Sequence, residues 1–116
     1  MIGFTLFLTL QGCNYYGHIP EPPLEASEKV RVYPLETEDL PLLEQDFIEP
    51  VDKLCNALLD IGDVDYLNAE QCRILLTWIS DRLGQPIGDR LVTIYRTLAD
   101  FAHQAISLNT GIVIEL

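Results

Sequence analysis

The sequence predicts an α+β fold: a small sheet of about three strands with three main helices packed on one face. Apolar residues alternate with other residues near both ends of the chain and in one middle segment, which is the period of a half-buried strand. Over most of residues 50–108 they recur at steps of three and four, which is the period of an amphipathic helix. A chain of 116 residues, 48% of them hydrophobic, is long enough for one domain with its own core, spanning residues 1–116.

Strands are predicted at both ends of the chain, in residues 2–11 and in residues 112–116. Alternate positions of the first segment are occupied by Ile2, Phe4, Leu6, Leu8 and Leu10. In the last segment, Ile112, Ile114 and Leu116 share one face. Because these two strands are the most apolar, we expect both to lie inside the same sheet.

Residues 12–28 are predicted to form an irregular surface loop. This segment is rich in proline and tyrosine, and proline disfavours both helical and ladder positions. A short strand follows in residues 29–35, with Val30 and Val32 on one face, and Pro34 ends it. The sequence leaves open whether this strand pairs with the first or the last.

Helix-terminal residues mark two of the helices. The first is expected to begin near Pro50, since proline suits the first helical position, and to stop at Gly62. The second is expected to begin at Asn68, which forms a capping box with Gln71, and to end at Gly84.

The longest helix is predicted in residues 87–108. Its apolar residues alternate in steps of four and three, as in a coiled coil: Ile87, Leu91, Ile94, Leu98, Phe101, Ala105 and Leu108. A core helix lying across a sheet produces the same pattern and is the favoured interpretation. A helix-mediated dimer is the alternative.

The negative charge is confined to the middle of the chain. Fourteen of the eighteen carboxylates lie in residues 21–70, together with only Lys29, Arg31 and Lys53, so this stretch carries the whole net charge of −11. A field of one sign attracts basic partners and repels nucleic acid and anionic membrane surfaces. We therefore predict neither nucleic-acid binding nor membrane association.

No catalytic motif is present, so we predict a protein that is not an enzyme and needs no cofactor or metal. The closely spaced Asp60, Asp63 and Asp65 lack the glycine and glutamate positions of a calcium loop, which favours an acidic loop before a capped helix. Of the three cysteines, Cys55 and Cys72 are expected to be buried free thiols. Such thiols suit a reducing cytoplasm.

Carboxylates gather beside aromatic residues in two segments, and we predict that these segments contact a basic protein partner. The predicted contact residues are Asp60, Asp63, Asp65, Tyr66, Glu70, Glu36, Glu38 and Asp39. The leading hypothesis is a small cytoplasmic inhibitor or immunity protein that neutralises a basic toxin, such as a nuclease. Its size and acidity are similar to those of such bacterial antitoxic proteins. We expect a monomer or a weak homodimer.

Two alternatives remain open. One is a subunit or adaptor that associates through the long C-terminal helix. The other is a lipoprotein anchored through Cys13, because residues 1–13 resemble a bacterial lipoprotein signal that ends in a lipidated cysteine. Such signals begin with basic residues, whereas the first basic residue here is Lys29. The alternation of apolar residues favours a strand instead.

Overall fold

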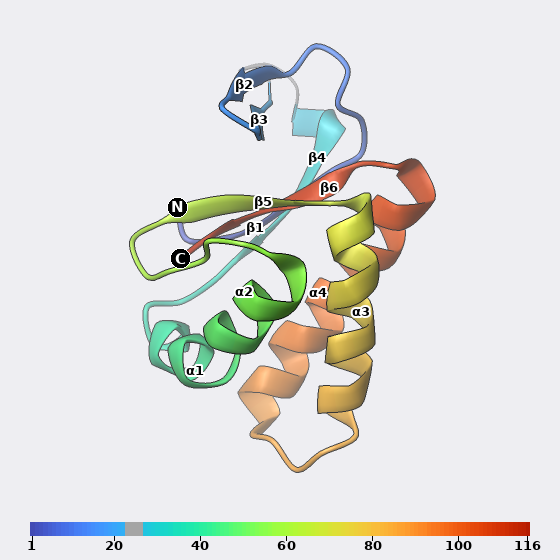
Figure 1. The fold of residues 1–116 in the computed structure, drawn as a ribbon. Coiled ribbons are helices and arrows are strands. Elements are labelled where there is room, and N and C mark those ends of the chain that lie inside the picture. The colour runs from blue at the N-terminus through green and yellow to red at the C-terminus, as the bar shows by residue number, and fades with distance from the viewer. Residues whose placement is uncertain (23–26) are drawn as a thin grey trace.

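The computed structural model describes residues 1–22 and 27–116, and its main sheet has four antiparallel strands in the order β4-β1-β6-β5. Helices cover one face of this sheet, and a two-stranded hairpin lies beyond the other face at one end (Figure 1). The elements in chain order are β1 (Gly3–Phe7), β2 (Asn14–Tyr16), β3 (Ile19–Glu21), the 3-10 turn η1 (Ser27–Lys29), β4 (Val30–Pro34), α1 (Asp39–Asp46), α2 (Ile48–Cys55), β5 (Val64–Asn68), α3 (Ala69–Leu83), α4 (Asp89–Leu108) and β6 (Gly111–Glu115). The predicted α+β class is confirmed.

The two terminal strands lie side by side in the middle of the sheet, as expected. In the ladder between them, Phe4 is opposite Ile114 and Leu6 is opposite Ile112, and all four side chains are fully buried. The second predicted strand, β4, pairs with β1 on its other side. Burial of apolar side chains in both central strands stabilises the sheet, since a fully buried aliphatic or aromatic side chain contributes about 2 kcal/mol.

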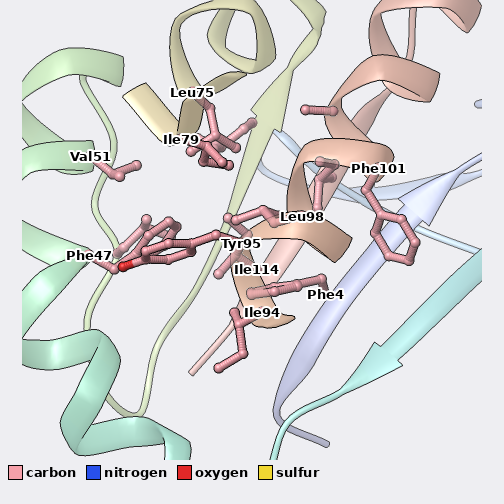
Figure 2. Close-up of a cluster of buried hydrophobic side chains, with 14 of the residues drawn as sticks. Phe4, Phe47, Val51, Leu75, Ile79, Ile94, Tyr95, Leu98, Phe101 and Ile114 are labelled. Carbon is pink, nitrogen blue, oxygen red and sulfur yellow. The ribbon is translucent and has the colours of Figure 1, made fainter. Parts of the chain in front are cut away.

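The seam of α4 packs inside the molecule. Leu91, Ile94, Leu98, Phe101 and Ala105 are buried, while Ile87 is half-buried and Leu108 is exposed. Figure 2 shows side chains from α4 meeting Phe4 of β1, Ile114 of β6 and Leu75 of α3 in one cluster. The core-helix interpretation is confirmed, because the apolar stripe is used against the sheet and α3.

The segment predicted as an irregular loop, residues 12–28, contains a β-hairpin. Strands β2 and β3 pair through a two-residue turn, in which Gly17 has a φ of 63°. A type II′ hairpin turn places glycine at this first position, because the backbone there is left-handed. Pro20 is tolerated in β3 because a two-stranded ribbon has open edges. Residues 23–26 of the predicted loop lie outside the described residues.

The stretch between Ile48 and Asn68 also differs from the prediction. The helix predicted to run to Gly62 ends at Cys55, because Asn56 adopts a left-handed conformation with a φ of 53° and closes α2. Leu58, predicted to continue the apolar face, is 80% exposed. The acidic loop expected before α3 ends in β5, a strand that was not predicted and that pairs with β6 in the main sheet.

An eight-residue helix, α1, precedes α2 and was not among the three main helices expected.

Candidate protein-binding surface

The topology brings four chain segments to one end of the sheet. Gly3 is paired with both Pro34 and Glu115, and Glu115 is paired with Val64. The connection that leaves β4 and the one that enters β5 therefore lie at the same end of the sheet, at its two opposite edges, with β1 and β6 between them. Figure 1 shows both chain termini and these two connections on the same side of the molecule.

This end of the sheet carries exposed carboxylates from two connections that are far apart in sequence. We call it the acidic end and define it by Glu36 and Glu38, which follow β4, and by Asp60 and Asp63, which precede β5. All four side chains are exposed. A shallow depression of about 210 Å³ lies here, and its lining includes Asp63 and Glu115.

Backbone hydrogen bonds hold the acidic end in place. The N–H of Asp63 donates to the carbonyl of Asp60 over 3.1 Å, and the N–H of Leu116 donates to the carbonyl of Asp63 over 3.0 Å. On the other side, the N–H of Leu35 donates to the carbonyl of Ile2 over 3.0 Å. The carboxylates thus project from backbone anchored to the sheet, which reduces the entropy lost when a partner binds.

The basic side chains of residues 1–22 and 27–116 form their ion pairs away from the acidic end. Among the described residues, the ion pairs formed by lysine and arginine leave these four carboxylates unused. The nearby Glu115 lies 3.4 Å from the N-terminal amino group, in an exposed pair. Exposed pairs of this kind contribute little to stability. The negative potential of the acidic end is therefore available to a partner.

Asp39, predicted as a contact residue, is instead part of the fold. It is 2% exposed, and both of its oxygens accept hydrogen bonds from the guanidinium of Arg90 at 2.7 Å. It also accepts from the N–H of Glu36 at 2.8 Å. The hydrogen bonds from Arg90 hold the pKa of Asp39 below its ordinary value despite burial. The side chain of Asp39 therefore faces inward and presents almost no surface to a partner.

Asp65 is also buried, with 5% of its surface exposed. Its carboxylate accepts the N–H groups of Leu58 and Tyr66, each at 2.8 Å, and lies 2.6 Å from Nε2 of His18. Burial acts to raise the pKa of Asp65, but these hydrogen bonds outweigh it and the pKa is lowered. Asp65 therefore joins the β-hairpin and the α2–β5 connection to the edge of β5.

Tyr66 and Glu70 complete the set predicted from the sequence. Tyr66 is 8% exposed and packs against Phe7, and its ring lies over Gly111, where a Cβ atom would collide with it. Burial raises the pKa of Tyr66 to about 12. Glu70 is exposed but follows β5 at the opposite end of the sheet, where it lies 3.7 Å from Arg73. Neither residue belongs to the acidic end.

Asp52 was not among the predicted site residues, but it stabilises the backbone of the acidic end. Its carboxylate accepts the N–H of Leu59 at 2.8 Å and so fixes the start of the connection that carries Asp60. Burial raises the pKa of Asp52, and the charges of Asp65 and Asp60 add to this effect. Asp52 lies seven residues before Leu59, and no sequence pattern indicates a hydrogen bond between the two.

Two of the cysteines are buried and free, as predicted. Burial raises the pKa of Cys55 to about 11 and that of Cys72 to about 12. Both thiols are therefore protonated at neutral pH and are poor nucleophiles, since the thiolate is the reactive form.

Among residues 1–22 and 27–116, His, Cys, Asp and Glu side chains form no group of three or more placed to hold a metal ion. No helix in this part of the chain has the length and apolar character needed to cross a membrane. Comparisons of the chain with protein-family models, curated proteins and solved structures found no match.

Proposed function

We propose that this protein binds a basic surface of another protein through its acidic end. The observation that carries the proposal is that Glu36 and Glu38 beside one edge strand, and Asp60 and Asp63 beside the other, are all exposed at the same end of the sheet. Like charges at one end of a protein oppose folding through self-repulsion, so a fold that exposes them on the same end favours a use for their field. Lysine and arginine on a partner would complement it.

The specific form of this proposal is a cytoplasmic inhibitor or immunity protein that neutralises a toxin with a basic groove, such as a nuclease. A nuclease binds phosphates with lysine and arginine, and fixed carboxylates offer the same negative charge to those groups. Binding of this kind needs no catalytic residue on the inhibitor. Electrostatic steering would also speed association, which suits a protein that must reach its toxin first.

The two alternatives have less support. An adaptor that associates through the long helix would need the seam of α4, most of which is buried in the core. A form cleaved before Cys13, as in a lipoprotein, would lack β1 and with it the buried Phe4 and Leu6. The central sheet described here therefore requires the segment that such processing removes.

Affinity capture from source-cell lysate with three matched baits tests the proposal. The baits are the wild type, an Asp60→Lys/Asp63→Lys variant of the acidic end, and a Glu70→Lys/Asp81→Lys control. Both variants change the net charge equally, and all four substituted side chains are exposed. Bound proteins are eluted with a salt step and identified by mass spectrometry.

We expect a basic protein that the wild type and the control retain, that salt releases, and that the acidic-end variant fails to capture. Equal loss of the partner from both variants would mean that only net charge matters. Retention of the same partner by the acidic-end variant, or resistance to salt, would contradict the proposed site, because exposed ion pairs are screened by salt.

A further inference from the structure

A second surface lies on the face of the sheet that the helices leave uncovered. Here a groove of about 320 Å³ runs between the β-hairpin and the strands. Its walls and floor are mostly apolar and come from the hairpin and from all four strands of the sheet: Thr5, Phe7, Tyr16, Ile19, Pro20, Pro22, Val30, Val32, Val64 and Val113. We call it the open-face groove.

The open-face groove exposes aliphatic side chains at positions where a sheet face in contact with water usually has polar side chains. Val32 is 48% exposed and Val64 is 39% exposed, and the hairpin adds Tyr16, which is 78% exposed. Tyrosine beside aliphatic residues is typical of the centre of a protein interface. The hairpin wall is fixed to the sheet by the pair between His18 and Asp65, at 2.6 Å.

The charged side chains that line the groove are acidic. Among the described residues they are Glu21 and Glu115, and Glu115 also lies 3.4 Å from the N-terminal amino group in an exposed pair. Val64 and Glu115 also line the depression at the acidic end, so the two surfaces are continuous. A ligand that lies in the groove therefore meets carboxylates at the groove itself and, further along, at Asp63.

We propose that the open-face groove receives an extended segment of the basic partner, with an aliphatic side chain in the groove and a neighbouring lysine or arginine directed at Glu115 and the acidic end. This inference rests on the proposed function and adds the sequence character of the bound segment. The apolar lining provides affinity through buried area, and the carboxylates select a cationic neighbour.

A second copy of this chain fits the groove less well. Each copy has a net charge of −11, and the groove's own charged residues are both carboxylates. Placing two such surfaces together would bring like charges into contact, which costs free energy. Charge complementarity therefore favours a basic partner over self-association.

Selection from a displayed library of random twelve-residue linear peptides on the immobilised wild-type protein tests the inference. Enriched peptides are synthesised and their dissociation constants are measured for three variants. Val32→Ser removes apolar surface from the groove, and Leu108→Ser is a control at a site of nearly equal exposure, 47% against 48%. Asp60→Lys/Asp63→Lys tests the acidic end independently.

We expect enriched peptides in which an aliphatic residue lies next to lysine or arginine. Val32→Ser should weaken their binding about tenfold, while Leu108→Ser leaves it unchanged, because one lost aliphatic contact is worth about one decade in affinity. The Asp60→Lys/Asp63→Lys variant should bind the same peptides more weakly than the wild type does. The salt dependence of this binding should not become steeper.

The two proposals fail in different ways. Peptides weakened by Asp60→Lys/Asp63→Lys but not by Val32→Ser would overturn the groove and leave the proposed function standing. Peptides weakened by Val32→Ser that are acidic or uncharged would overturn the charge complementarity. No enrichment, or self-association of the pure protein that Val32→Ser abolishes in light scattering, would also overturn the groove's assigned occupant.

Discussion

The acidic residues of this protein fall into two groups that differ in what their oxygens contact. Asp39, Asp46 and Asp65 accept hydrogen bonds from arginine, tyrosine, histidine or backbone N–H groups and have little exposed surface. The carboxylates of the acidic end, such as Glu38 and Asp63, are exposed and form no ion pair among the described residues, although Asp60 accepts the N–H of Ile61 at 2.8 Å. The first group holds distant segments together, whereas the second is free to serve a partner.

The largest effect on stability is expected at Asp46. Its carboxylate accepts from Nε of Arg82 at 3.1 Å and from the hydroxyl of Tyr95 at 2.6 Å, and Tyr95 is fully buried. Asp46→Ala leaves this hydroxyl without its partner, so we expect a loss of about 3 kcal/mol in the free energy of unfolding. Glu44→Ala, an exposed carboxylate on the same helix, should change it by less than about 0.5 kcal/mol. Urea denaturation of both variants measures the difference, and equal losses would remove the distinction between the groups.

Asp63 and Asp65 are only two positions apart in the sequence but belong to different groups, so they allow the same comparison. Asp65→Ala removes three hydrogen-bond acceptances and should cost about 2 kcal/mol, while Asp63→Ala should cost less than about 0.5 kcal/mol. Amide hydrogen exchange would show faster exchange at Leu58 and Tyr66 in the first variant only. Unchanged protection at these two amides would contradict the role given to Asp65.

Stability is expected to fall at low pH because of the first group. Asp39, Asp46 and Asp65 have pKa values lowered from 3.8, so their stabilisation is fully present above pH 3.8 and is lost as pH falls through the lowered values. Asp52 has a raised pKa and the opposite sign, so its contribution is present below pH 3.8 and is lost as pH rises through the raised value.

Urea denaturation as a function of pH measures these contributions. The unfolding free energy of the wild type should drop below pH 4, and Asp39→Asn should make that drop shallower. Asp52→Asn should flatten the curve on the other side, as pH rises above 3.8. A wild-type curve that is level down to pH 2 would mean that the buried carboxylates gain nothing from their partners.

The smallest effect is expected at the acidic end itself. Neutralising it with Glu36→Gln, Glu38→Gln, Asp60→Asn and Asp63→Asn relieves repulsion between like charges, so the unfolding free energy should rise by a few tenths of a kcal/mol at low salt. The gain should vanish at high salt, because exposed charges are then screened. A loss of more than about 1 kcal/mol would show that these carboxylates support the fold.

Local signals in the sequence predicted local structure well. The capping box at Asn68 is formed, with the N–H of Gln71 donating to the Asn68 side chain at 2.9 Å and the Gln71 side chain accepting from the N–H of Asn68 at 2.9 Å. The buried terminal strands also followed from their apolar alternation, as did the internal seam of α4. Each of these depends on residues a few positions apart.

The partners of the internally paired carboxylates could not be predicted in this way. Asp46 and Arg82 are 36 residues apart, and Asp39 and Arg90 are 51 residues apart. Only the folded chain brings them together, so an aspartate that pairs internally looks in the sequence like one that is solvated. In β5, Asp65 interrupts the apolar pattern, and the strand was therefore not predicted.

The sequence predicted that the candidate site is acidic, but it did not predict where the site lies in the fold. Glu36, Glu38, Asp60 and Asp63 were all predicted contact residues, and the order of strands β4-β1-β6-β5 decides that they share one end of the sheet, at its two edges. The same order puts Glu70 at the far end of β5. Strand order depends on long-range pairing, which periodicity does not encode.

A nuclear magnetic resonance titration tests most directly whether the acidic end is a binding surface. Isotope-labelled protein is titrated with a peptide rich in lysine and arginine, at low and at high salt, and amide shifts are followed. The account predicts that the largest shifts fall at Glu36, Glu38, Asp60 and Asp63 and disappear at high salt. Shifts centred on α3 and α4, or shifts that persist unchanged at high salt, would contradict it.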